Sequence, residues 1–394
     1  MICDALVIGG GPAGATIAQL LARAGWSVMV AEKAAFPRRK VCGEFMSATS
    51  MTLLDALGVG TAFAHAAGPD IRQVGLFARD ATLTSAMPRV SASEFWGRAL
   101  GRDRLDALLL EAAARAGARV RQPAKVVAVQ RVGNAFACAI DENGTTSQVE
   151  ARIVVAADGS WERGVVADID TAHRPSDLLA FKAHFRGSAL PRDLMPLIVF
   201  PGGYGGLVTS DDGRVSLSCC IRRDVLERCR RQFRAARAAD AVLQHIFASC
   251  DGVRNALLAA DLDGAWLAAG PIRPGVRARH RDGVFMVGNR AGEAHPIVAE
   301  GISMAAQSAW LLAQRLIARQ DDIVAGRARD DVGARYVSDW DAAFLTRIRA
   351  AAAFAHLAMR PAAVALLLPM FRQFPAMLTF GAALSGKTRQ VVAA

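Results

Sequence analysis

Three glycines near the start of the chain have a spacing that suits phosphate binding. Gly9, Gly11 and Gly14 form a G-x-G-x-x-G pattern directly after the apolar run 5–8. The first glycine permits a tight turn, the second lets the backbone approach a diphosphate, and the third lets a helix pack closely on a strand. Glu32 can accept hydrogen bonds from a ribose. The pattern predicts a dinucleotide site, and the acid favours FAD or NAD over NADP.

The surrounding residues predict a strand–helix–strand unit that would position these groups. An apolar strand over 5–8 leads into the glycine turn, an alanine- and leucine-rich helix over 13–24 ends at Gly25, and a second strand over 27–31 ends at Glu32. The helix N-terminus would offer N–H groups and a positive dipole end to the phosphates. Ala13, which begins the helix, and Lys33, which follows the acid, are further candidate cofactor contacts.

A second stretch that could do chemistry, FPRRKVCGEFMS, covers residues 36–47. It combines cations, a thiol and a carboxylate: Arg38, Arg39, Lys40, Cys42 and Glu44. Such a basic run is usually a solvated turn. Beside a nucleotide, however, the cations could lie along the diphosphate, and Gly43 would permit close backbone approach. Cys42 could equally be a small buried hydrophobe.

The composition fits a globular protein with a large core. The chain has 394 residues, of which 53% are hydrophobic and 21% charged, enough for two domains or for one domain with a long insertion. The net charge is +11, but the basic residues are scattered arginines, the longest basic run is RRK, and the chain has two tyrosines for base stacking. We therefore predict no nucleic-acid partner.

Cysteine and histidine usage predicts a reduced protein without a metal. The seven cysteines include no C-x-x-C pair, which favours a cytoplasmic protein over a disulfide framework. The seven histidines show no metal-ligand spacing. The N-terminus enters a strand at once, so we predict no signal peptide.

Three later segments resemble the group A flavoprotein monooxygenases and the geranylgeranyl reductase family. RDRLDALLLEAAARAGARV contains an R-x-x-L-D that starts at Arg102, ARIVVAADGS leads to Asp158, and GVFMVGNRAGEAHPIVAEGIS resembles the late FAD motif of these proteins. A strand AKVVAV carries Val126, which in such proteins lies against the adenine. The motifs cover roughly 1–170 and 280–320 in family order, and the resemblance implies FAD.

The resemblance also implies an architecture. We expect an α/β fold: a Rossmann-like FAD-binding domain of the glutathione-reductase type, an inserted antiparallel substrate sheet and a C-terminal helical segment. The change from alternating strand-like runs to helical periodicity within 171–275 supports this, with one or two helices expected between Leu226 and Ala259. The expected ranges are 1–70, 98–170 and 276–330 for the FAD domain, 71–97 and 171–275 for the substrate domain, and 331–394 for the helical segment.

The late motif departs from the family at one residue. Gly288 is followed by Asn289 where the family usually has Asp, and an amide can still bond the ribityl chain of FAD. The resemblance implies that the helix after this loop points its N-terminus at the flavin. Pro296, Gly301 and Ile302 are the further cofactor contacts expected there.

KVCGE resembles the family segment that folds back over FAD. The resemblance implies that Cys42 and Glu44 lie near the flavin ring, where burial would raise the pKa of Glu44 toward neutrality for acid–base work. His295 is a further catalytic candidate, and Tyr204 is a candidate substrate contact.

The tail over 350–386 is almost uncharged. Arg360, Arg372 and three prolines interrupt it, which makes it too broken for a spanning helix. It could be a core-packing helical tail, a hydrophobic cover over an apolar substrate, or a peripheral membrane contact.

These features favour an FAD-dependent oxidoreductase, most simply an NAD(P)H- and oxygen-dependent monooxygenase or oxidase of an apolar or aromatic small molecule. A prenyl ene reductase is the alternative, although PGGYGGL (201–207) lacks the tryptophan and second Phe-Pro of the prenyl reductase motif. A halogenase, whose W-x-W-x-I-P is absent, and a non-catalytic flavin carrier are further alternatives. No second complete glycine motif occurs, so NAD(P)H would act as a transient reductant.

Overall fold

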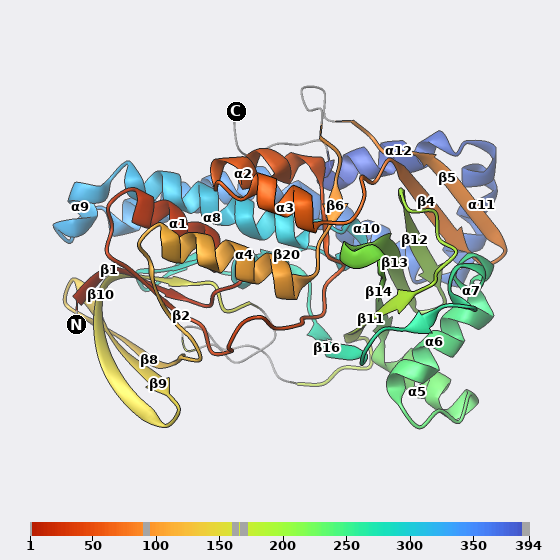
Figure 1. Cartoon of the computed structure of the whole chain (residues 1–394), viewed down its shortest axis with the longest axis horizontal. Helices are drawn as coiled ribbons and strands as arrows, with labels where there is room; N and C mark the ends of the chain where they lie inside the picture. Colours follow the sequence, from red (N-terminus) through yellow and green to blue (C-terminus); the bar gives the residue numbers. More distant parts are fainter. Residues whose placement is uncertain (1, 90–94, 160–164, 166–171, 388–394) are drawn as a thin grey trace.

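The structure, a computed structural model, describes residues 2–89, 95–159, 165 and 172–387. Figure 1 shows two halves side by side, each built on a β-sheet, with a long helix running between them. The predicted domain boundary at 170/171 lies outside the described residues.

The first sheet has the order β18-β19-β10-β1-β2-β7, and β19, β10, β1, β2 and β7 run parallel. Its central strands are buried on both faces, which explains their continuous apolar runs. Helices α1, α4 and α8 pack together over one face (Figure 1). The strands are β1 (Ile2–Ile8), β2 (Val28–Ala31), β7 (Arg119–Arg121), β10 (Thr145–Ala156), β18 (His280–Arg281) and β19 (Val284–Met286), and the helices are α1 (Pro12–Arg23), α4 (Arg102–Arg115) and α8 (Gly301–Ile317). A ribbon of β8 (Lys125–Val132) and β9 (Ala135–Glu142) extends from β10.

The second sheet has the order β15-β11-β14-β13-β12-β4-β5, with β16 also paired to β11. It is antiparallel as expected, except that β4 runs parallel to β12. The strands are β4 (Gln73–Ala78), β5 (Ala81–Ala86), β11 (Leu178–Arg186), β12 (Leu194–Phe200), β13 (Gly203–Thr209), β14 (Val215–Arg222), β15 (Asp261–Leu262) and β16 (Leu267–Ile272).

Three helices, not the expected one or two, cover the outer face of this sheet. They are α5 (Arg223–Gln232), α6 (Ala238–Ser249) and α7 (Asp251–Leu257). The run breaks at Arg234, whose φ of 49° is left-handed, and again at Cys250, whose backbone is extended. Helical periodicity alone did not reveal these breaks, which cover residues 233–237 and Cys250.

The C-terminal helices connect the two halves. Helix α10 (Arg329–Ala358) packs on α8 and reaches the second sheet, where α11 (Pro361–Gln373) and α12 (Ala376–Ala382) lie against β4 and β5 (Figure 1). No single helix among the described residues is long and apolar enough to cross a bilayer, although α10 and α11, which meet at 101°, would meet that test of length and composition as a pair. The remaining α-helices and strands are α2 (Met51–Ala56), α3 (Gly60–Ala66), α9 (Gln320–Val324), β3 (Phe45–Met46) paired with β6 (Arg98–Ala99), and β17 (Gly275–Val276) paired with β20 (Gly292–Glu293).

Candidate active site

A cavity of ≈ 850 Å³ lies between the two sheets and beneath α11 and α12. It gathers nearly all the residues that the sequence singled out, from segments more than 200 positions apart. Those that line it are Gly9, Gly11, Ala13, Glu32, Lys33, Lys40, Cys42, Gly43, Glu44, Arg102, Val126, Asp158, Tyr204, Gly288, Asn289, His295, Pro296, Gly301 and Ile302. Gly14 lies behind this wall, and Arg39 does not line the cavity.

The glycine turn has separate requirements at its three positions. Gly9 has φ +100°, and a Cβ there would stand 2.7 Å from the carbonyl oxygen of Ala157. A Cβ on Gly14 would stand 1.8 Å from the Gly9 carbonyl oxygen, so close packing of helix on strand needs glycine. At Gly11 the nearest protein atom would be Nη2 of Arg102 at 3.8 Å. The fold therefore requires Gly9 and Gly14, whereas Gly11 leaves space that belongs to the cavity.

Three cationic side chains, Arg38, Lys40 and Arg102, line the cavity together with this turn. Burial and the nearby charges of Arg102 and Arg38 lower the pKa of Lys40 to about 8. Arg102 begins α4 and is held by two hydrogen bonds to Asp106, at 2.6 and 2.7 Å. A diphosphate at the N-terminus of α1, which has no side-chain cap, would offset this repulsion.

The opposite end of the turn is shaped for a ribose and a base. Glu32 lies at the end of β2, where its carboxylate accepts the N–H groups of Gly10 at 2.7 Å and Ala34 at 3.0 Å. Its lone pairs are not exhausted by these bonds, so it can also accept ribose hydroxyls. Val126 on β8 adds a buried apolar contact beside it.

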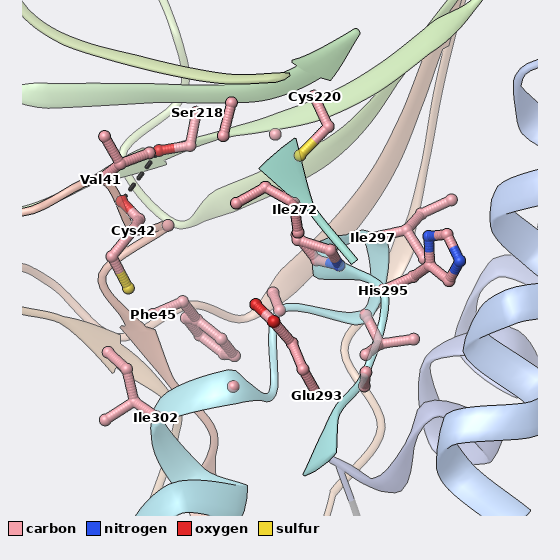
Figure 2. Close-up of a pocket in the computed structure, with 18 of the residues that line it drawn as sticks. Val41, Cys42, Phe45, Ser218, Cys220, Ile272, Glu293, His295, Ile297 and Ile302 are labelled. Carbon is pink, nitrogen blue, oxygen red and sulfur yellow. Dashed lines mark hydrogen bonds between the residues drawn. The ribbon is translucent and has the colours of Figure 1, made fainter. Parts of the chain in front are cut away.

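The late motif supplies the other wall, with a carboxylate that the sequence analysis missed. Asn289 donates its amide N–H to Glu293 at 3.0 Å, and Arg277 lies 3.5 Å from the same carboxylate. Glu293 is buried and points into the cavity (Figure 2). An acid four residues beyond the position where the family's acid is missing was the available signal. Gly301 opens α8 with free space at its Cβ position.

Together these residues fit FAD. The glycine turn, the cations beside it and the N-terminus of α1 suit a diphosphate. Glu32 suits the ribose of an adenosine, and the N-terminus of α8 suits a flavin. All these groups line one continuous cavity.

Cys42 lies where this cleft meets the second sheet. The hydroxyl of Ser218 on β14 donates to the Cys42 carbonyl at 2.9 Å, which ties the loop to the sheet. The thiol accepts the N–H of Glu44 at 3.4 Å and lies near Phe45 and Ile302 (Figure 2). Cys42 is therefore part of the wall beside the expected flavin position.

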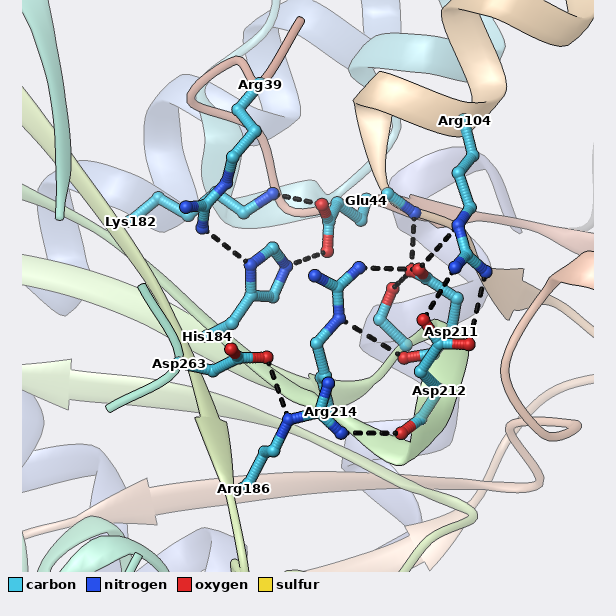
Figure 3. A network of polar contacts seen from close by, with 12 residues as sticks. Arg39, Glu44, Arg104, Lys182, His184, Arg186, Asp211, Asp212, Arg214 and Asp263 are labelled. Carbon is cyan, nitrogen blue, oxygen red and sulfur yellow. Dashed lines mark hydrogen bonds and ion pairs between the residues drawn. The ribbon is translucent and has the colours of Figure 1, made fainter. Parts of the chain in front are cut away.

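The prediction of a raised pKa for Glu44 was wrong. Burial does act to raise it, but the hydrogen bond from His184 and the charge of Lys182 outweigh burial and lower the pKa of Glu44 to about 2. One carboxylate oxygen is 2.9 Å from Nε2 of His184 and the other binds Lys182 (Figure 3). Both partners come from β11, and nothing in the local sequence KVCGE reveals them. Glu44 is thus ionised at neutral pH.

Arg39 belongs to the same polar network and not to the cofactor cleft. Its guanidinium lies 3.0 Å from Nδ1 of His184 (Figure 3). Arg38 and Lys40, its two neighbours along the chain, line the cavity instead.

Tyr204 and His295 meet at the far side of the flavin end. The phenol oxygen of Tyr204 is 3.1 Å from Nδ1 of His295, and Tyr204 is the cross-strand neighbour of Cys220. Burial raises the pKa of Tyr204, raises that of Cys220 to about 12, and, with the charge of His356, lowers that of His295 to about 4. At neutral pH the phenol and thiol keep their protons and the imidazole is neutral.

The remaining part of the cavity is an apolar chamber, which we define by its lining residues. They come from the inner face of the second sheet and from α11 and α12: Val74, Leu76, Met195, Val199, Val208, Val364, Leu368, Phe371, Met377 and Leu378. The tail therefore covers the cavity, one of the three roles considered for it. The sequence predicted an apolar tail but not these contacts.

The fold and site define an FAD-dependent oxidoreductase. The chain belongs to the family described as FAD binding domain, whose model matches residues 2–343. This confirms the predicted family, the fold class and FAD as the cofactor.

Individual relatives span several activities. The chain is 27% identical over 323 residues to digeranylgeranylglycerophospholipid reductase 1 of Methanothermobacter thermautotrophicus, which covers 79% of this chain and 76% of that protein. The structure of the present chain resembles that of a flavin-dependent brominase. The TM-score is 0.78, the identity is 19%, and the match covers 98% of this chain and 94% of the brominase. It also resembles a probable FAD-dependent monooxygenase from Pseudomonas aeruginosa, with a TM-score of 0.68, 20% identity and coverage of 94% and 100%. At these identities the structural likenesses establish the fold alone.

Proposed function

We propose that this enzyme reduces a carbon–carbon double bond in a long apolar substrate of isoprenoid type. The observation that carries the proposal is the apolar chamber that joins the flavin end of the cavity beside side chains that keep their protons at neutral pH. Bound FAD would supply a hydride for this chemistry. The chain's own residues must hold the substrate, exclude water and deliver one proton.

The proton requirement separates reduction from hydroxylation. Double-bond reduction adds a hydride to one carbon and a proton to the other, so it needs an acid. Tyr204 lines the cavity beside His295 and is the acid that we assign; because burial raises the pKa of Tyr204, loss of its proton must be coupled to proton supply from His295. Activation of a phenol for hydroxylation needs a base instead, and Glu44, with a pKa of about 2, is too weak a base to serve.

We therefore favour prenyl reduction over the monooxygenase that the sequence made the first of its alternatives. The missing tryptophan in PGGYGGL had argued against prenyl reduction, yet Gly205 and Gly206 of that segment line the cavity, where the segment can contact an apolar substrate. The archaeal relative is named as a reductase of a geranylgeranyl lipid, which also favours reduction. NADPH or NADH would act as the external reductant, approaching the flavin from solvent.

The test is a comparison of products with and without oxygen. FAD-loaded protein is incubated with NADPH and geranylgeraniol, a polyprenyl alcohol, and separately with a long-chain alkylphenol. We expect the prenyl alcohol to gain hydrogen under anaerobic conditions, as detected by mass spectrometry. Oxygen incorporation into the phenol, with no hydrogen gain by the prenyl alcohol, would establish a hydroxylase instead. Dithionite replaces NADPH in a parallel reaction, so that failure of the reductant is distinguished from failure of the substrate.

We also propose that the outer surface of α11, α12 and the π-helical turn that follows them (Ala383–Lys387) contacts an anionic lipid bilayer. Four large apolar side chains are exposed there: Leu366 (79%), Phe374 (58%), Phe380 (64%) and Leu384 (52%). The inner side of the same helices lines the chamber, so a lipid-soluble substrate would have a short path into it. Arg360 and Arg372 on this segment and the net charge of +11 complement anionic headgroups.

Vesicle sedimentation tests this surface. The wild-type protein should sediment with phosphatidylglycerol vesicles, and Leu366→Glu together with Phe380→Glu should abolish sedimentation. The matched control is Leu258→Glu, which changes a leucine that is 70% exposed at the end of α7. Equal binding by both variants would exclude the α11–α12 surface.

A further inference from the structure

We propose that His356 and His295 form a proton relay that carries protons from the protein surface to Tyr204 at the cavity. The inference rests on the proposed function, because reduction of a double bond consumes one proton from the protein in each turnover. Three side chains from separate segments lie in series between solvent and the cavity. They are His356 on α10, His295 just before the helical turn at Pro296, and Tyr204 on β13.

Tyr204 and His295 are in hydrogen-bonding contact, whereas His295 and His356 are in ring contact, so proton transfer between the two histidines needs a bridging water. Nδ1 of His295 is 3.1 Å from the Tyr204 oxygen, and the rings of His295 and His356 lie edge to face with centroids 5.6 Å apart. His356 is exposed, His295 is 8% exposed and Tyr204 is 1% exposed, so exposure to solvent falls steadily along the series. Histidine exchanges protons with water near neutral pH and passes them between its two ring nitrogens.

The proton that Tyr204 gives to the substrate is replaced by the relay, so Tyr204 is not left as a phenolate. As Tyr204 gives its proton to the substrate carbon, the Nδ1–H of His295 passes to the phenol oxygen, and the other ring nitrogen, Nε2, receives a proton from His356 by way of a bridging water. His356 is then reprotonated by water. The buried site disfavours both a charged His295 and a tyrosinate, so the three transfers must be coupled.

Among the described titratable groups around Tyr204 and His295, we identify only the path through His356 as one that leads to solvent. Cys220 on β14 and Glu293 on β20 are the titratable groups that act on Tyr204, and His356 is the one that acts on His295. Glu293 is engaged by Asn289 and Arg277, and Cys220 is buried in the sheet, so neither leads to the surface. His356 is the member of the cluster that meets water.

The relay is tested first without turnover. In protein labelled with nitrogen-15 histidine, we expect NMR to find His295 as a neutral ring that carries its proton on Nδ1. Exchange of that proton with solvent should slow at least about tenfold in both His356→Ala and His356→Gln. The control, His65→Ala, removes an exposed histidine on α3 and should leave exchange unchanged. Unchanged exchange in both His356 variants, or a proton on Nε2 of His295, would overturn the relay even if no prenyl substrate is reduced.

The second test uses geranylgeraniol reduction. His356→Ala should lower turnover roughly tenfold to a hundredfold, toward the low end for lost acid–base help, with KM unchanged. Added imidazole should restore the rate of His356→Ala and leave that of Tyr204→Phe low. A His356→Ala enzyme with the parental rate and pH profile would overturn the relay while leaving the reductase proposal intact.

Discussion

The nucleotide cleft and the apolar chamber are two parts of one cavity, yet they are built in different ways. In the cleft, most cofactor-binding residues lie close together in the sequence. Gly9, Gly11 and Gly14 form a turn, and Glu32 follows the second strand of the same strand–helix–strand unit. In the chamber, each wall contributes single side chains from β4, β12, β13, α11 and α12. Phosphates are recognised by backbone groups at fixed local spacing, whereas an apolar substrate is recognised by shape and dryness.

The Glu44 network, shown in Figure 3, lies at the border of these two parts and has features of both. It begins in a recognisable sequence segment, but its electrostatics come from β11 of the second sheet. Substitutions in the cleft, at the border and in the chamber should therefore have separable effects on cofactor binding, stability and substrate affinity.

The largest expected effect comes from Gly11→Val in the cleft. No protein atom except Nη2 of Arg102 comes within 4 Å of a Cβ at this position, so the variant should fold with the parental circular dichroism and thermal unfolding. The branched side chain would occupy the diphosphate space, and we expect a colourless protein that retains no FAD. Gly14→Ala is the contrasting variant, because its Cβ would clash with backbone and should prevent folding itself. Retention of FAD by folded Gly11→Val would contradict the assignment of this space to the cofactor.

At the border, Glu44→Gln should cost about 3–5 kcal/mol in the free energy of unfolding at pH 7, because it leaves Lys182 buried without its counter-charge. The folded-state pKa of Glu44 lies below its ordinary value of 4.5, at about 2. Its stabilising contribution is thus fully present above pH 4.5 and lost as the pH falls toward 2. Urea unfolding at several pH values should show the two proteins converging in acid. The control, Glu111→Gln, removes an exposed pair with Arg115 and should cost less than about 1 kcal/mol. A pH-independent difference would mean that the loss is steric.

In the chamber, Leu378→Gln should impair substrate affinity without affecting FAD. Leu378 is buried against the cavity, and an amide there would meet an apolar chain without a hydrogen-bond partner, at a cost of about 1–3 kcal/mol. This predicts a rise in KM for geranylgeraniol of roughly tenfold to a hundredfold. Leu384→Gln, at an exposed position in the same segment, should leave KM unchanged. Loss of FAD from Leu378→Gln would show that cleft and chamber are not separable.

The smallest expected effect is at Asn289→Asp, where the family's acid is restored. Because Asn289 donates to Glu293, the variant places two carboxylates within hydrogen-bonding distance, and one pKa should rise. We expect FAD affinity to fall by about 1 kcal/mol at alkaline pH and to recover on acidification, as measured by FAD titration. Adding Glu293→Gln should remove the pH dependence. If affinity is independent of pH in Asn289→Asp, the two side chains do not interact.

Much of the cleft could be predicted, because its recognition elements are contiguous in sequence. The glycine turn, Arg102 at the first position of α4, Asp158 after β10 and Gly288 after β19 all lie where the motifs placed them. The position of Arg39 could not be predicted, since a loop of three consecutive cations does not specify which of them face inward. Glu293 lay inside the resembling motif, four residues beyond Asn289, but its spacing alone did not show that the two side chains are hydrogen-bonded.

The sequence by itself determined the parallel nucleotide-binding sheet, the FAD cofactor and an apolar tail, because glycine spacing and hydrophobic periodicity act through neighbours along the chain. Tertiary structure alone decided that Glu44 is ionised, that His356 meets His295 and that α11 and α12 cover the chamber. Those facts depend on which groups are buried together in the folded chain. Desolvation depends on burial and Coulomb energy on distance in three dimensions, and neither follows from separation in sequence.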